Sequence, residues 1–187
     1  MKKYKNKYRI KSARHPNWDY RSNGLYFITI CTQNRTHFFG DIITDKNGLP
    51  SVSLSEIGKI VEIEWLKTFE MRPDMNLWMG EFVVMPNHFH AIIGIGDNEF
   101  NTQCRDAIRC VSTTNMNANT KNKFGPQSKN LASIVRGFKI GVTKNSRLIN
   151  PDFSWQPRYH DHIIRNDKSF YTISNYIEQN PLNWEKR

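Results

Sequence analysis

Cysteine, acidic residues and long apolar runs are all scarce in this sequence. Its 187 residues include three cysteines, Cys31, Cys104 and Cys110, an odd number without metal-site spacing. They predict a reducing, cytoplasmic setting rather than a disulfide framework. No apolar run approaches the roughly 20 residues that a membrane helix requires. The basic segment Met1–Arg9 has no apolar core behind it, unlike a secretory signal. We therefore expect neither a membrane protein nor a secreted protein that is stabilised by disulfides.

Positive charge, in contrast, is abundant. The chain has 27 Lys and Arg residues against 17 Asp and Glu, a formal net charge of +10 and a pI near 9.6. Such an excess attracts polyanions, of which nucleic acid is the commonest, although a merely soluble basic protein has the same composition. Residues 1–20 are predicted to form a basic N-terminal arm. Lys3, Lys5 and Lys7 would lie on phosphates there, or the arm would simply be solvated.

Hydrophobic patterning predicts one compact domain over residues 21–187. Aromatic and β-branched runs indicate strands at 25–32, 77–85, 88–95 and 159–164, and apolar faces of helical period indicate helices at 55–70, 130–145 and 168–179. A short extended piece is expected at 37–43 and a long loop at 97–129. This order predicts an α+β, ferredoxin-like (RRM-like) fold. Its antiparallel sheet carries helices on one face and leaves the other free for a ligand, and a further helix follows at the C-terminus.

The motif Pro86-Asn87-His88-Phe89-His90 is the first candidate for chemistry. Side chains alternate along a strand, so His88 and His90 point to one face while Phe89 points to the core. Two imidazoles at this spacing can bind one metal ion, although a lone His-x-His pair is more often a hydrogen-bonded or surface pair. A metal site also needs at least one further protein ligand.

The last predicted helix offers that ligand. Tyr176 and Asn180 are four residues apart and therefore share one side of the helix. An amide oxygen from Asn180 could complete a metal site and place the Tyr176 hydroxyl one turn away. Phenol has a pKa of about 10, so a tyrosine nucleophile needs a Lewis acid or an activating group beside it. The alternatives are ordinary packing for Tyr176 and a helix-terminal role for Asn180 ahead of Pro181.

A second His-x-His pair, His160 and His162, allows a purely structural interpretation. With His88 and His90 it could form a four-imidazole zinc site. The intervening Asp161 and the following Arg165 favour a salt-bridged strand instead.

Four blocks of the sequence, in this order, resemble the single-tyrosine HUH transposases, and the closer subgroup is the REP-associated tyrosine transposases. The resemblance covers residues 20–184. The first block is Tyr26-Phe27-Ile28-Thr29 with Cys31-Thr32 and Asn34-Arg35, and the second is Met85 to His90. The third is Trp155-Gln156 with Asp161-His162 and Ile164-Arg165, and the fourth is Tyr176-Ile177 with Asn180-Pro181.

The resemblance implies a metal-dependent single-stranded DNA endonuclease and strand transferase. His88, His90 and Asn180 would be the ligands of Mg²⁺ or Mn²⁺, and Tyr176 would form a 5′-phosphotyrosine bond while freeing a 3′-hydroxyl. The substrate would be single-stranded DNA with imperfect hairpins, either REP-like or at element ends, in the cytoplasm at the nucleoid. A homodimer is one of the assemblies that the resemblance allows.

Two other functions fit the same residues. One is a binding module for hairpin DNA or RNA in which the histidines are silent, and the other is a metal phosphodiesterase that uses water. For the endonuclease and strand transferase, the DNA contacts would come from the basic arm and from Arg136, Lys139 and Lys144 on the second helix.

Overall fold

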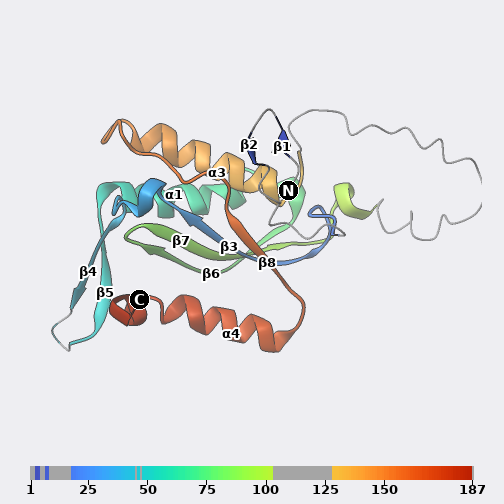
Figure 1. The fold of residues 1–187 in the computed structure, drawn as a ribbon. Coiled ribbons are helices and arrows are strands. Elements are labelled where there is room, and N and C mark those ends of the chain that lie inside the picture. Colours follow the sequence, from blue (N-terminus) through green and yellow to red (C-terminus); the bar gives the residue numbers. More distant parts are fainter. Residues whose placement is uncertain are drawn as a thin grey trace, which may run out of the picture.

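The computed structural model describes residues 3–4, 7–8, 18–44, 46, 48–102 and 128–186. Its centre is a four-stranded antiparallel sheet with the strand order β6-β7-β3-β8 (Figure 1). The strands are β3 (Gly24–Cys31), β6 (Leu77–Met85), β7 (His88–Ile95) and β8 (His160–Ile164). All four lie where the hydrophobic patterning predicts strands, and the α+β class is confirmed.

Helices cover both faces of this sheet. α1 (Glu56–Glu70) and α3 (Leu131–Ser146) pack together on one face, and α4 (Asp167–Glu178) lies on the other (Figure 1). Each helix begins at a polar side chain that accepts a backbone N–H three residues on, namely Ser55, Asn130 and Asn166. The face predicted to be free for a ligand is therefore partly covered by the C-terminal helix.

The alternation of side chains along β7 separates two apolar layers. Phe89 lies in the main core, where its ring is 5.1 Å from that of Trp65 and 5.2 Å from that of Phe138. On the opposite face Ile92 and Ile177 belong to a smaller cluster between the sheet and α4. The stripe of Phe170, Ile173 and Ile177 that the helical period predicts packs into this second cluster.

The turn between β6 and β7 is fixed from the side by the end of β3. Thr32 donates its hydroxyl to the carbonyl of Asn87 at 2.9 Å, and its backbone N–H donates to the same carbonyl at 3.0 Å. The N–H of Phe39 donates to the carbonyl of Pro86 at 3.0 Å. The Pro86-Asn87 bend, predicted because proline interrupts a ladder, therefore holds a defined position at the start of β7.

A small β-hairpin extends from the edge of the domain. β4 (Gly40–Thr44) pairs with β5 (Pro50–Leu54), and β5 also contacts the C-terminal 3₁₀ helix η3 (Pro181–Lys186). Gly40 has a φ of +134°, and a Cβ there would lie 2.0 Å from the carbonyl oxygen of Ser53. The sequence predicts only the first of these strands, at 37–43, and the second is an addition from the structure.

Two short strands lie within the predicted basic arm. Lys3 and Lys7 belong to the short paired strands β1 (Lys3–Tyr4) and β2 (Lys7–Tyr8), whereas Lys5 lies outside the described residues. Within the described part of the chain, no helix is long and apolar enough to cross a membrane.

Candidate active site

The two histidines of β7 meet beneath α4. His88 and His90 are buried and their ring centroids are 4.5 Å apart. They share the face opposite Phe89, as the strand period predicts. The imidazole of His90 also stacks on Phe27 of β3, with 5.3 Å between ring centroids. Packing on both sides therefore sets the orientation of the pair.

A hydrogen bond to Nδ1 holds each imidazole. The side-chain oxygen of Asn87 accepts from Nδ1 of His88 at 2.8 Å. Oγ1 of Thr29, directly across from His90 in the β3–β7 register, lies 2.8 Å from Nδ1 of that ring. A proton held on Nδ1 leaves the lone pair of a neutral imidazole on Nε2, which is the arrangement found in metal-binding histidines.

Tyr176 is the tyrosine that reaches this pair. Its hydroxyl lies 3.4 Å from Nε2 of His90, and the two ring centroids are 5.4 Å apart. The side chain comes from α4 of the same chain and stays 41% exposed. Tyr26 differs, because burial raises its pKa to about 12 and it lies in the main core. Of these two phenols, only Tyr176 combines access from solvent with a place beside the histidines.

Asn180 is buried, with 1% of its surface exposed, at the start of the segment that follows α4. Neither its amide oxygen nor its amide nitrogen has a hydrogen-bond partner among the described residues. Along the chain it lies between Tyr176, which approaches His90, and Trp184, whose ring stacks on His88 with 5.9 Å between centroids. A buried amide without partners is costly, by about 1–3 kcal/mol, so this position fits a residue that binds something further.

The four-imidazole interpretation is wrong. In the β3 register His160 pairs with Thr29 and His162 with Phe27, so both lie on the far side of β3 from His90. Strands are spaced by about 4.8 Å, which puts two strand spacings between the histidine pairs. Both residues are exposed. No group of three or more His, Cys, Asp or Glu side chains that could hold a metal occurs among the described residues.

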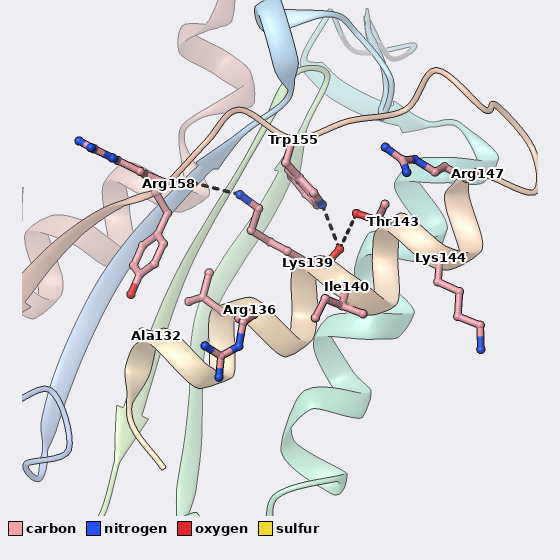
Figure 2. Close-up of a pocket in the computed structure, with 11 residues that line it drawn as sticks. Ala132, Arg136, Lys139, Ile140, Thr143, Lys144, Arg147, Trp155 and Arg158 are labelled. Carbon is pink, nitrogen blue, oxygen red and sulfur yellow. Dashed lines mark hydrogen bonds between the residues drawn. The ribbon is translucent and has the colours of Figure 1, made fainter. Parts of the chain in front are cut away.

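The predicted basic contacts of the second helix lie elsewhere. Arg136, Lys139 and Lys144 line a groove on the outer side of α3 (Figure 2). This helix covers the face of the sheet opposite α4 (Figure 1). The structure therefore does not bring these cations together with Tyr176, and any contact they make with a ligand is on a separate surface.

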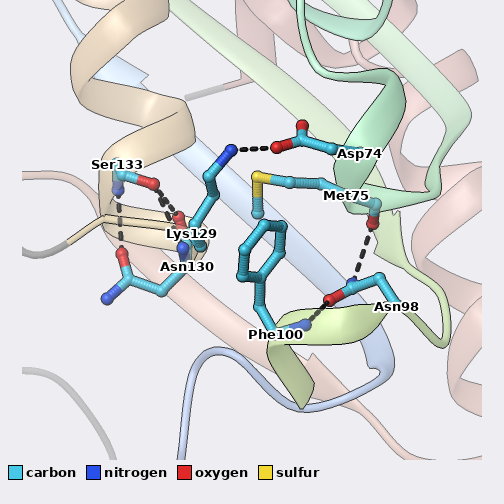
Figure 3. Close-up of polar contacts among 7 residues, drawn as sticks. All are labelled: Asp74, Met75, Asn98, Phe100, Lys129, Asn130 and Ser133. Atoms are coloured by element: carbon cyan, nitrogen blue, oxygen red, sulfur yellow. Dashed lines mark hydrogen bonds and ion pairs between the residues drawn. The ribbon is translucent and has the colours of Figure 1, made fainter. Parts of the chain in front are cut away.

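The long segment predicted at 97–129 is described only at its two ends, since residues 103–127 lie outside the described residues. Those ends lie side by side. Nζ of Lys129 is 4.6 Å from the centroid of the Phe100 ring and pairs with Asp74 (Figure 3). On the incoming side the Asn98 amide donates to the Met75 carbonyl at 3.0 Å. On the outgoing side the side chains of Asn130 and Ser133 form a capping box.

Three residues at the site were missed by sequence reasoning as functional candidates. Thr29 and Asn87 bind the two imidazoles, and Trp184 covers one of them. Asn87 is next to His88 in the motif, so adjacency was a usable signal. Thr29 becomes recognisable only once the register between β3 and β7 is known.

Two Haemophilus influenzae proteins are similar to this chain in sequence. An uncharacterised Haemophilus influenzae protein is 36% identical over 177 residues, which span 94% of this chain and 90% of the relative. A second protein of that organism, provisionally named a REP-associated tyrosine transposase, is 24% identical over 164 residues, or 88% of this chain and 73% of the relative. No protein-family model matches the sequence.

A solved structure shares the fold. It is that of a REP-associated tyrosine transposase bound to a REP hairpin, with a TM-score of 0.55 and 19% identity over 91% of this chain and 73% of that one. The fold and the sequence relatives together define a transposase-like protein with a tyrosine helix on an antiparallel sheet. The chain is thus similar in sequence to a protein provisionally named a REP-associated tyrosine transposase, and it shares the fold of a solved transposase of that kind.

Proposed function

We propose that this chain is a metal-dependent endonuclease and strand transferase for single-stranded DNA, with Tyr176 as its nucleophile. The observation that carries the proposal is the 3.4 Å approach of the Tyr176 hydroxyl to Nε2 of His90, one of two imidazoles held at Nδ1. The similarity to a protein named as a tyrosine transposase supports DNA as the substrate, and the solved transposase that shares the fold is bound to a REP hairpin. We therefore expect sites flanked by hairpins, reached in the cytoplasm at the nucleoid.

His88, His90 and Asn180 would hold the metal. Two imidazoles and one amide oxygen are a donor set that Mn²⁺ accepts, and Mg²⁺ accepts the oxygen donors readily. The buried amide of Asn180, without partners among the described residues, supports its place in this set. When bound, Mg²⁺ or Mn²⁺ would supply Lewis-acid polarisation of the scissile phosphate.

The remaining chemistry belongs to the chain. The Tyr176 oxygen attacks phosphorus and loses its proton, the bond from phosphorus to the 3′ oxygen breaks, and that oxygen takes up a proton. The products are a 5′-phosphotyrosine and a free 3′-hydroxyl. Because one phosphodiester replaces another, the reverse attack by a 3′-hydroxyl rejoins the strand without an external energy source. The contact between Tyr176 and His90 is formed within one chain, so assembly as a homodimer stays a prediction.

A covalent-adduct assay tests this proposal, with Tyr171→Phe as a matched control. Tyr171 lies on the same helix, is 65% exposed and contacts Phe170 rather than the histidines. End-labelled single-stranded hairpin DNA from the flanks of the gene would be incubated with each variant, with Mn²⁺ or with a chelator. We expect a denaturation-resistant protein–DNA band that requires metal, persists in Tyr171→Phe and disappears in Tyr176→Phe.

Two results would overturn the proposal and replace it with a different function. Cleavage without a covalent band, retained in Tyr176→Phe, would indicate a phosphodiesterase that uses water. Binding of several flanking hairpins with no cleavage in any variant would indicate a non-catalytic hairpin-binding module.

A further inference from the structure

The outer side of α3 carries a groove of about 590 Å³ that the proposed chemistry does not use. Its walls are α3 and the segment from Trp155 to Tyr159 (Figure 2). Eleven residues line it, of which five are basic and none is acidic, namely Arg136, Lys139, Lys144, Arg147 and Arg158. A concave surface with charge of one sign attracts a ligand of the opposite sign.

Part of the lining of the groove is apolar. It includes Val135, Trp155 and Ile140, and Ile140 is 61% exposed although it occupies the middle of a helix. An apolar lining with an exposed Ile140 among cations fits a ligand that has both anionic groups and apolar surfaces. The backbone of DNA has both, because its anionic phosphates alternate with deoxyriboses that expose aliphatic carbons.

Lys139 of α3 connects the two walls of the groove. Its ammonium donates to the carbonyl of Gln156 at 3.0 Å and lies 5.7 Å from the centroid of the Trp155 ring. It also donates to the carbonyl of Arg158 at 3.2 Å (Figure 2). Burial lowers the pKa of Lys139. Because its ammonium already donates hydrogen bonds to these two carbonyls, Lys139 acts as a positioning residue. The sequence had predicted it as a direct DNA contact.

The residue that Lys139 positions has an uncommon backbone conformation. Arg158 has a φ of +71°, in the left-handed region that few residues other than glycine adopt. Such conformations persist only where surrounding contacts enforce them, and they cluster at functional sites. The hydrogen bond from Lys139 to the Arg158 carbonyl therefore places the exposed Arg158 beside the groove, two residues before the edge strand β8.

We infer that this α3 groove binds the sugar–phosphate backbone of the folded, hairpin part of the DNA, while the α4 face receives the strand to be cut. The inference rests on the proposed function and deepens it. The row from Arg136 to Arg147 is about 16 Å long at 1.5 Å per residue, which spans about five phosphates of one duplex strand. Passage between the two surfaces would follow the edge at β8, where His160 and His162 are exposed.

The test compares Lys144→Gln/Arg158→Gln with Lys46→Gln/Lys59→Gln, which removes two exposed charges outside the groove. Fluorescence anisotropy would measure binding of a hairpin with a single-stranded tail, and of the tail alone, from 50 to 200 mM salt. Two lost phosphate contacts lower the salt slope by about two, so the groove variant should lose about tenfold less affinity over this range than wild type. Its binding of the tail alone should be unchanged.

Other outcomes of the binding experiment would overturn either the groove inference or the proposed chemistry of Tyr176. Equal weakening by the control pair would reduce the effect to net charge and overturn the inference. Unchanged hairpin binding in the groove variant, with loss of binding to an acidic peptide, would assign the groove to a protein partner and also overturn it. Groove-dependent hairpin binding without any Tyr176 adduct would refute the proposed chemistry and leave the groove standing, so the two failures are distinguishable.

A separate experiment tests whether Lys139 acts by positioning Arg158. Lys139→Met should weaken hairpin binding in the wild-type background and cost much less in an Arg158→Gln background, because residues in one network are not additive. Equal costs in both backgrounds, with unchanged circular dichroism, would show that Lys139 contacts the DNA directly and that the positioning role is wrong.

Discussion

Replacement of Asn180 by leucine should separate stability from function. The side chain is 1% exposed and its amide has no hydrogen-bond partner among the described residues, so without a bound ligand it costs about 1–3 kcal/mol. Leucine has a similar size and no polar atoms. Each kcal/mol corresponds to about 2–4 °C in Tm for a chain of this length. We therefore expect the metal-free variant to have a Tm at least about 2 °C higher than that of metal-free wild type.

The same substitution should abolish the response to metal. A ligand at one hundred times its Kd stabilises the folded state by about 2.7 kcal/mol, which Mn²⁺ should do for wild type and not for Asn180→Leu. Differential scanning calorimetry with Mn²⁺ and with chelator measures both effects. Asn175→Leu, at an exposed position of α4, is the control and should respond to Mn²⁺ as wild type does. A lower Tm without metal, or an undiminished shift with Mn²⁺, would refute the reasoning.

Three further predictions concern single contacts. Thr29→Val removes the hydroxyl that lies 2.8 Å from Nδ1 of His90 and should weaken Mn²⁺ binding by about 10–100-fold; an unchanged affinity in isothermal titration calorimetry would contradict this. Trp65→Ala leaves a cavity among Phe69, Phe89 and Phe138 and should cost about 3–5 kcal/mol in urea unfolding, whereas a cost below 1 kcal/mol would not fit a fully buried ring. Burial raises the pKa of Cys31, so in a Cys104→Ser/Cys110→Ser background its alkylation by iodoacetamide at pH 8 should be slower than that of free cysteine, and an equal rate would show an accessible thiolate.

The sheet and its histidine face were predictable because their signals are local. Alternation along β7 is enough to put His88 and His90 on one face and Phe89 in the core. The stripe of α4 is equally local, since residues three and four apart share a helix face. Both patterns need no knowledge of which strand is the neighbour.

What the sequence could not predict depends on contacts between distant segments. Thr29 is 61 residues from His90 and meets it only through the β3–β7 register. β5 begins with Pro50 and has the mostly small, polar sequence PSVSL, so neither propensity nor hydrophobicity marks it as a strand. Asn180 was expected at the site from its spacing to Tyr176, but that spacing does not reveal that the side chain is buried, directly before a 3₁₀ helix that contacts β5.

The tyrosine helix lies over the histidines of its own chain, and this sets the kinetics of the proposed reaction. If Tyr176 is the nucleophile as proposed, the rate of adduct formation per molecule should not depend on protein concentration, because Tyr176 meets His90 within one chain. A single Tyr176 can also carry only one DNA end at a time. Two breaks made in succession by one molecule would therefore require release of the first end before the second, so that the rejoining of strands is ordered in time by the occupancy of one side chain.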